Sequence, residues 1–164
     1  MQAIVRFADG TLGVSERESL RPVPASSKLR LTNLLLSDHQ DDSDCPTDPM
    51  NPLCVKGVRI SMPAQPQFAR ATPLLIYFGM LGLELGDNQR PALSVSFRLG
   101  FGDAFKSVNA EKLFITAGST PNSFLALGSF DLRALQPGKY TLEMTAEDKI
   151  QHAQAKETTA FLIQ

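Results

Sequence analysis

The residue types best suited to bind a metal form an acidic stretch in the first third of the chain. It contains five aspartates: Asp38, Asp41, Asp42, Asp44 and Asp48. Clustered carboxylates supply the oxygen ligands that Ca²⁺ prefers. Their spacing does not match an EF-hand loop, because the glycine and the distal glutamate of that motif are missing. We therefore interpret the stretch as a solvated loop between two strands, with calcium binding as the alternative, and predict no metal ligand.

The chain has two histidines, His39 in the acidic stretch and His152 near the C-terminus. Ser37, Asp38 and His39 place the three residue types of a catalytic triad side by side. Because triads are assembled from residues that lie far apart in sequence, this adjacency does not indicate catalysis. We expect solvent-exposed imidazoles and no catalytic residue, and therefore a protein that is not an enzyme.

A glycine-containing stretch, Gly100-Phe101-Gly102-Asp103-Ala104-Phe105, starts like a dinucleotide-binding fingerprint. The third glycine of that motif is missing, and no strand–helix–strand unit surrounds the stretch. We predict a turn after a strand, with no cofactor-binding residue and no cofactor.

Two cysteines, Cys45 and Cys54, flank a proline-rich segment. A disulfide could close this segment in an oxidising compartment, and two free thiols are the alternative that the sequence leaves open. A structural zinc site needs about four well-placed Cys or His ligands, and Cys45, Cys54 and His39 are too few.

The charge and the hydropathy of the sequence bear on whether the chain binds nucleic acid or a membrane. The chain has 164 residues, 16 basic and 17 acidic, and a formal net charge of -1. This balance gives no general attraction to nucleic acid or to an anionic membrane. The longest apolar run, residues 74–83, is about half of what a membrane-spanning helix needs. The first residues show no basic segment followed by an apolar core, so they do not form a signal peptide.

Period-two alternation is the clearest structural signal, because successive side chains of a strand point to opposite faces. Apolar and polar residues alternate over Leu93–Phe101 and again over residues 140–146. Residues 74–80 are apolar on both faces, as in a central strand covered on both sides.

Weaker patterns complete the set of strands. We predict strands over residues 29–36, 113–115 and 153–163, and over 53–60 and 125–132 with a β-bulge or a bend at Gly57 and at Gly128. Residues 103–112 are the best helical candidate, and they are short. The aromatic residues inside these strands are predicted to form the core: Phe97, Phe101, Phe114, Phe130, Tyr140 and Phe161.

A corner joins the last two long segments. Pro137 and Gly138 suit the central positions of a type II turn, and Tyr140 stands where a tyrosine corner returns its hydroxyl to upstream backbone. About seven strands follow from residue 29 onward. We therefore predict an all-β, immunoglobulin-like antiparallel β-sandwich over residues 25–164, preceded by a β-hairpin over residues 1–24 that we interpret as the tail of an earlier β-domain.

These features together resemble a known family. The closing Val23-Pro24, the Leu29-to-Asp38 segment, Pro73-Leu74-Leu75-Ile76-Tyr77-Phe78 and Leu135-Gln136-Pro137-Gly138-Lys139-Tyr140 are similar to the β-sandwich that follows the von Willebrand factor A domain in bacterial secreted "VWFA-related" proteins. The A domain and its Asp-x-Ser-x-Ser metal motif are absent from this chain. The resemblance implies an exported, extracytoplasmic protein with an interaction role, and it assigns no site.

Three functions can be compared. The leading hypothesis is a non-catalytic interaction or structural module with a protein partner, which presents loops and strand edges on a rigid sandwich. The alternative is a small-ligand or carbohydrate-binding accessory domain, which the absence of tryptophan weakens. The third hypothesis is an enzyme, which would need a cleft that brings His39 or His152 against a carboxylate and a nucleophile.

Overall fold

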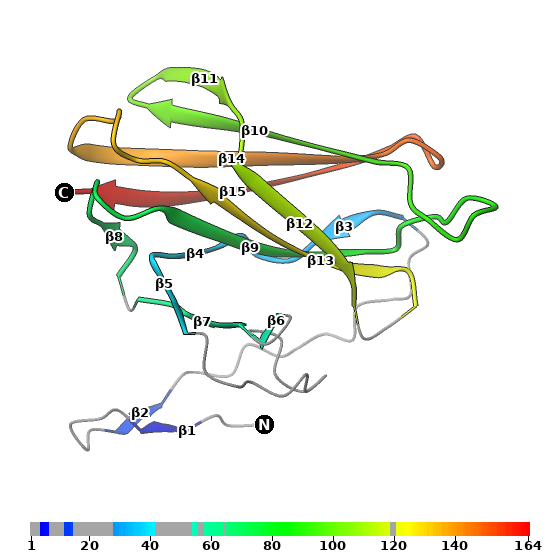
Figure 1. Cartoon of the computed structure of the whole chain (residues 1–164), viewed down its shortest axis with the longest axis horizontal. Coiled ribbons are helices and arrows are strands. Elements are labelled where there is room, and N and C mark those ends of the chain that lie inside the picture. The colour runs from blue at the N-terminus through cyan, green and yellow to red at the C-terminus, as the bar shows by residue number, and fades with distance from the viewer. Residues whose placement is uncertain are drawn as a thin grey trace.

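The computed structural model of the chain describes residues 4–6, 12–14, 28–41, 54–55, 58–63, 65–118 and 121–164. Within these ranges the chain is all-β and forms no helix, as predicted. Two larger sheets lie face to face, and a small sheet lies beside them (Figure 1). The strands, in chain order, are β1 (Ile4–Arg6), β2 (Leu12–Val14), β3 (Arg30–Leu31), β4 (Leu35–Ser37), β5 (His39–Asp41), β6 (Cys54–Val55), β7 (Val58–Ser61), β8 (Gln67–Phe68), β9 (Leu74–Leu81), β10 (Leu93–Phe101), β11 (Ala104–Val108), β12 (Lys112–Ala117), β13 (Ser123–Phe130), β14 (Gly138–Asp148) and β15 (Ala153–Ile163).

The first sheet has the order β11-β10-β14-β15-β8. Its neighbours are antiparallel, except that β8 runs parallel to β15. The two alternating segments of the sequence form its centre, and β14 extends two residues beyond the predicted strand at each end. The predicted closing hairpin of β14 and β15 is confirmed.

The second sheet has the order β12-β13-β9-β3, and β4 also pairs with β9. The prediction of a central strand over residues 74–80 is confirmed, because β9 pairs on both sides and is buried along most of its length. The predicted strand over residues 29–36 is divided into β3 and β4. Thr32 continues the pairing with Gly79, and one extra residue then shifts the register before β4.

The core lies between the two larger sheets. Phe97 of the first sheet meets Phe78 and Phe130 of the second, with ring centroids 6.3 Å and 5.2 Å apart and edge-to-face geometry. Each fully buried large apolar side chain contributes about 1.5–3 kcal/mol relative to exposure. Apolar burial between the two sheets is therefore a major source of stability for the sandwich.

The small sheet has the order β5-β7-β6 and packs on the outer side of the second sheet. Ile60 of β7 contacts Tyr77 of β9, with Leu125 and Leu127 of β13 around them. Burial raises the pKa of the Tyr77 hydroxyl. The second sheet is thus apolar on both faces, which explains why its sequence lacks simple alternation.

The bulge or bend predicted at Gly128 is absent, and Gly57 lies outside the described residues. Gly128 lies in unbroken register within β13, and the apparent phase slip arises because both faces of this strand are covered. The single strand predicted over residues 53–60 is wrong, because β6 and β7 are separate strands that pair antiparallel, with Val55 opposite Val58. A tight reversal produces the same interruption of alternation as a bulge.

Residues 103–112, the best helical candidate in a sequence that we predicted to be all-β, form no helix. Phe101 pairs with Ala104, so β10 turns into β11 through Gly102 and Asp103. Gly102 has a φ of 58°, and glycine at the first central position is typical of a type II′ hairpin turn.

Two of the six predicted core aromatics are exposed. Phe114 is 54% exposed because Leu113 takes the inward position on β12, which leaves Phe114 on the outer face. Phe101, at the end of β10, is 47% exposed. The other four are buried.

The N-terminal hairpin is present as predicted, since β1 pairs antiparallel with β2. Its turn lies outside the described residues, as do Cys45 and residues 42–50 of the acidic stretch. The disulfide and calcium alternatives, and the division of the chain at residue 24, therefore stay predictions.

Candidate interaction surface

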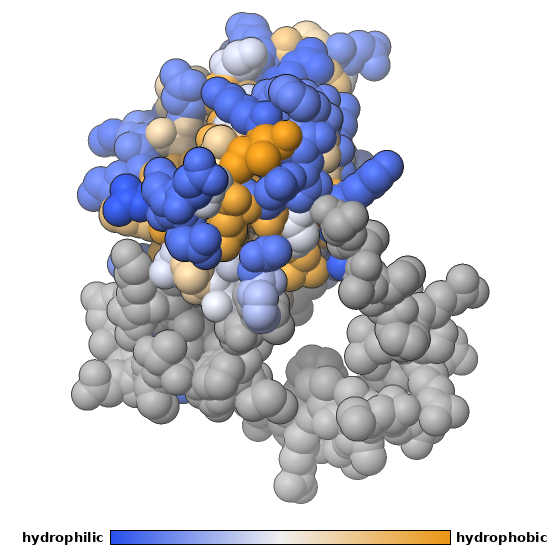
Figure 2. Space-filling view, turned by 90° about the vertical axis from the view of Figure 1, so that its right-hand side faces the viewer, coloured by the Kyte–Doolittle hydropathy of each residue, from blue (hydrophilic) through white to orange (hydrophobic). Residues whose placement is uncertain are grey.

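Three connections meet at one end of the sandwich, which we call the loop end: residues 82–92 after β9, residues 121–122 before β13, and residues 149–152 between β14 and β15. In Figure 1 these connections lie on the right. Figure 2 looks directly at this end and shows polar residues around a small apolar patch. Loops on a rigid scaffold are where binding residues concentrate.

A buried carboxylate braces the loop end. Asp148, at the end of β14, has no exposed surface. Its Oδ2 accepts the N–H of Glu84 at 2.8 Å, and its Oδ1 accepts the N–H groups of Ile150 and Gln151 at 2.9 and 3.2 Å. The Gln151 side chain donates to the Gly82 carbonyl at 2.7 Å. Two connections that are distant in sequence are thus fixed to each other, which preorganises whatever site they form.

The sequence analysis missed Asp148, although a signal was present. The inward positions of β14 are Tyr140, Leu142, Met144, Ala146 and Asp148. A carboxylate that continues an apolar face must be paired or hydrogen-bonded. Extending the alternation by one inward position beyond the predicted strand would have identified it.

A groove with a volume of about 1120 Å³ opens at the loop end. We call it the loop-end groove, and among the described residues its lining includes Lys28, Arg30, Leu81, Glu84, Asn122, His152 and Gln154. His152, one of the two histidines of the sequence, is exposed here and has a φ of 52°. Positively and negatively charged groups and amides therefore face one open space.

Arg30 is the unusual member of this lining. It lies on β3 directly opposite Leu81, and its Nε is buried without a hydrogen-bond partner. Buried N–H groups of charged side chains are costly to leave unpaired. An orphaned donor of this kind requires a physical explanation.

The opposite end contains the predicted tyrosine corner, which is confirmed. The Tyr140 hydroxyl donates to the Gln136 carbonyl at 3.0 Å, and its ring lies between Phe101 and Phe161, with centroids 4.9 and 5.7 Å away. The type II turn is wrong, because Gly138 has a φ of 148° instead of about +80°. A Cβ there would lie 2.7 Å from the Phe101 ring, so only glycine fits.

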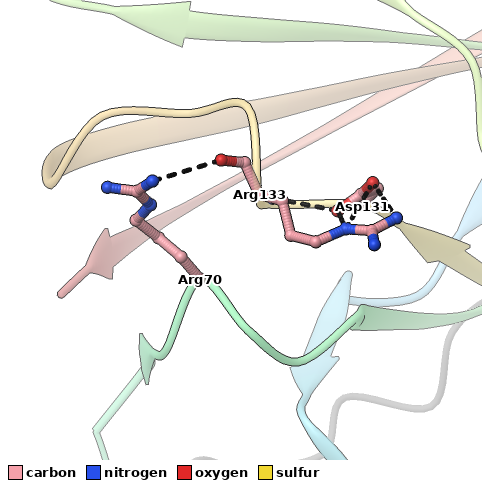
Figure 3. A network of polar contacts seen from close by, with 3 residues as sticks. All are labelled: Arg70, Asp131 and Arg133. Carbon is pink, nitrogen blue, oxygen red and sulfur yellow. Dashed lines mark hydrogen bonds and ion pairs between the residues drawn. The ribbon is translucent and has the colours of Figure 1, made fainter.

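A compact ion pair holds the connection that precedes this corner (Figure 3). Asp131 accepts the backbone N–H and the guanidinium of Arg133, at 2.9 Å and 2.8 Å. These bonds lower the pKa of Asp131 to about 2. Arg70 then donates to the Arg133 carbonyl at 3.3 Å. Asp131 and Arg70 thus hold the backbone of Arg133 in place, and the Arg133 side chain holds the Asp131 carboxylate.

An apolar groove lies under this connection, in two adjoining parts of about 240 and 390 Å³. Leu99, Val108 and Leu135 line both parts, and Lys106 and Gln136 stand at the second. Concave apolar space with a few polar groups is the usual form of a small-ligand site.

The outer face of the first sheet carries a cross-strand charge ladder. Glu143 lies between Arg98 at 3.3 Å and Lys156 at 2.6 Å, and the hydrogen bond from Lys156 is the main reason that the pKa of Glu143 is lowered. The Arg98 guanidinium lies 5.2 Å from the centroid of the Phe105 ring, which covers Gly100. Cross-strand packing of this type stabilises a sheet and explains the position of Phe105 without a ligand.

Strands β11 and β12 end their respective sheets in the part of the chain that the structure describes. Ile115 on β12 is 40% exposed. Edge strands with exposed apolar side chains can accept another strand.

The residues that suggested a triad do not form one. Ser37 is fully buried, and its hydroxyl lies within hydrogen-bonding distance of the His39 and Ser61 carbonyls and accepts the His39 N–H at 3.1 Å. Asp38 and the His39 side chain are exposed. The Ser37 hydroxyl is therefore used to join β4, β5 and β7.

The other candidates can be placed as follows. The stretch from Gly100 to Phe105 is the β10–β11 hairpin turn. No group of three or more potential metal ligands occurs among the described residues, and no helix within them is long and apolar enough to cross a membrane.

Comparisons with known proteins add no family. No protein-family model matches the chain, and no curated protein matches it.

Proposed function

We propose that this chain is a non-catalytic interaction module, an immunoglobulin-like sandwich of an exported bacterial protein that binds another protein through its loop end. The observation that carries this proposal is the open loop-end groove beside connections fixed by the buried Asp148 carboxylate. A rigid set of loops around a groove binds a partner at a low cost in conformational entropy.

The strand order supports the immunoglobulin-like part of the proposal. The second sheet runs β3-β9-β13-β12 and the first contains β10-β14-β15. Taken in chain order, these correspond to the A-B-E-D and C-F-G sheets of immunoglobulin domains. The connections at the loop end then correspond to the B–C and F–G loops, which carry binding residues in variable domains.

Export is the part of the proposal that comes from the resemblance to VWFA-related sandwiches. The segments that carry it are the two leucine-rich strands, now β3–β4 and β9, and the corner that ends at Tyr140. An extracytoplasmic location also suits a chain with two cysteines, which can pair in an oxidising compartment.

Capture by the full chain tests the proposal. Immobilised wild type, Gln154→Trp and Lys139→Trp are exposed to envelope and culture-medium proteins of the source organism, and bound proteins are quantified by mass spectrometry. Gln154 lines the groove, whereas Lys139 is also an exposed strand position but lies at the opposite end. We expect at least one protein that binds wild type and Lys139→Trp and is reduced about tenfold or more by Gln154→Trp.

Equal capture by all three chains, or capture by none, would contradict binding through the loop end. A protein lost only with Lys139→Trp would move the interaction to the corner end.

The apolar groove favours a second candidate, a small-ligand or carbohydrate-binding module. Its exposed Phe101 and convergent Lys106 and Gln136 fit that function. A panel of oligosaccharides and small apolar compounds should then include one that raises the melting temperature of wild type and not of Val108→Trp, which fills the groove. A panel without such a compound counts against this candidate.

A further inference from the structure

We propose that two copies of this chain associate through the free edge of β12, so that their second sheets join into one continuous antiparallel sheet. This inference goes beyond the proposed function, because it concerns a strand edge and not the connections of the loop end. Its evidence is an unprotected edge, at one border of the second sheet (Figure 1), whose sequence is complementary to itself.

The pairing of β12 with β13 shows which way each backbone group of β12 points. Gly118 donates its N–H to the Ser123 carbonyl at 2.8 Å, and these two residues continue the register of the two strands. Hydrogen-bonded pairs alternate along an antiparallel ladder, so every second residue points its N–H and C=O away from β13: Leu113, Ile115 and Ala117. Because β12 ends its sheet in the described part of the chain, these groups have no strand partner there.

The other borders of the two larger sheets have the features that keep strand edges apart. Natural edge strands are short or carry charges, lysine above all. β11 has Lys106 at its middle, and β8 covers only the end of β15, whose remaining edge carries Lys156 and Glu157. β3 and β4 are two and three residues long. β12 is charged only at its first residue, Lys112, and the rest of the strand has no such protection.

The apolar side chains of β12 are exposed on both faces of the sheet. Ile115 lies opposite the buried Ala126, which places it on the inner face, yet it is 40% exposed. Phe114 lies on the outer face and is 54% exposed. A strand added at this edge would cover both side chains, since cross-strand neighbours contact each other on each face.

The sequence of β12 favours a second copy of the same strand. In an antiparallel pair about a two-fold axis at Phe114, the two Phe114 rings face each other and Leu113 faces Ile115 of the second copy. Leu113 and Ile115 both point their backbone groups outward, so each such pair exchanges two hydrogen bonds. Lys112 faces Thr116, and no like charges meet. Moving the axis by one residue either way would set Phe114 against Lys112 or Thr116.

Sedimentation equilibrium of the full chain measures this association. Between about 1 µM and about 1 mM, the mass of wild type should rise from one copy to two and stop there, because a two-fold contact is closed. Ile115→Lys should raise the dissociation constant about tenfold or more. Ser107→Lys is the matched control, because it adds the same charge at an exposed position of the edge strand β11, and it should associate like wild type.

Three results of this experiment would overturn the proposal. The first is a wild type that stays monomeric over the whole range, and the second is a mass that rises beyond two copies. The third is equal association of Ile115→Lys and Ser107→Lys, which would place the contact elsewhere.

Amide hydrogen exchange observes the edge in wild type alone, so it does not depend on how a variant folds. At low concentration the amides of Leu113 and Ile115 should exchange as unprotected groups. Where about nine-tenths of the chain is dimeric, their exchange should be slower by about tenfold. The amides of Phe114 and Thr116 already bond to β13 and should change much less. Exchange of Leu113 and Ile115 that does not depend on concentration would contradict the edge pairing.

Cysteine cross-linking tests the register. Across the axis the two Cα atoms at position 114 would lie about 4.5 Å apart, within the range of about 4.4–6.8 Å that a disulfide spans. Those at position 116 would be about 13 Å apart. Under mild oxidation Phe114→Cys should form a disulfide between the two copies at position 114, located by peptide mapping because of the native Cys45 and Cys54. An equal yield at position 116 in Thr116→Cys would contradict this register.

Discussion

Replacing Asp148 should show how much its hydrogen bonds at the loop end contribute to the stability of the fold. In Asp148→Asn the amide oxygen can take the place of Oδ1 and keep the bonds from Ile150 and Gln151. The amide nitrogen then faces the N–H of Glu84, which loses its acceptor. A lost hydrogen bond to a charged group costs about 1.5–3 kcal/mol.

The larger substitution, Asp148→Ala, removes all three acceptor contacts and should cost about 4–6 kcal/mol. That loss approaches the total stability of a small domain, about 5–15 kcal/mol, so the asparagine variant is the informative one. The chain has no tryptophan, so urea unfolding is followed by circular dichroism. Asp87→Asn, an exposed turn position at the same end, should stay within about 0.5 kcal/mol of wild type. If Asp148→Asn unfolds at the midpoint of Asp87→Asn, the carboxylate does not brace the loops.

Three further predictions concern the corner, the edge and the charge ladder. Tyr140→Phe loses the hydrogen bond to Gln136 and should lower the free energy of unfolding by about 1 kcal/mol. An unchanged urea midpoint would show that this hydrogen bond does not stabilise the fold. Ile115→Lys places a charge on the edge strand β12 and should reduce self-association in sedimentation at high concentration, whereas equal association would show that this edge is not adhesive. Glu143→Gln should lower the urea midpoint at pH 7, and the difference from wild type should vanish as the pH falls below about 4. The pKa of Glu143 is lowered in the fold, so the ionised carboxylate stabilises the protein above the unfolded pKa, and this stabilisation is lost as the carboxylate protonates in the folded state. A difference between the two proteins that persists at pH 2.5 would contradict the ion pairs as its cause.

Much of the fold was predictable because it depends on local pattern. Residues 93–101 and 140–146 alternate, and both became strands of the first sheet. The corner was found from the position of Tyr140 at the start of a strand, although the turn type read from Pro137 and Gly138 was wrong. Local geometry decides such features, and the sequence contains it.

The errors occurred where two local patterns look alike or where both faces of a strand are covered. The segment predicted as one strand over residues 53–60 contains the paired strands β6 and β7, and the interruption at Gly128 reflects the small sheet packed on the outer face. Phe114 shows the same limit, since its neighbour Leu113 and not the aromatic ring points inward.

The candidate site was not predictable in the same way. His152 was singled out as a residue type, and the structure places it in the groove. Arg30 was not singled out, because its significance is the lack of a partner, which depends on residues distant in sequence. The Asp148 contact with Glu84 spans 64 positions, and no local pattern shows which distant N–H groups a carboxylate will reach.

Amide hydrogen exchange of the free chain tests most directly the central claim that the loop end is a rigid, prebuilt binding surface. The account predicts that the amides of Glu84, Ile150 and Gln151, although they lie outside the strands, exchange as slowly as those in the middle of β14. Exchange of these three amides at the rate of an unprotected loop such as the Gly102–Asp103 turn would contradict it.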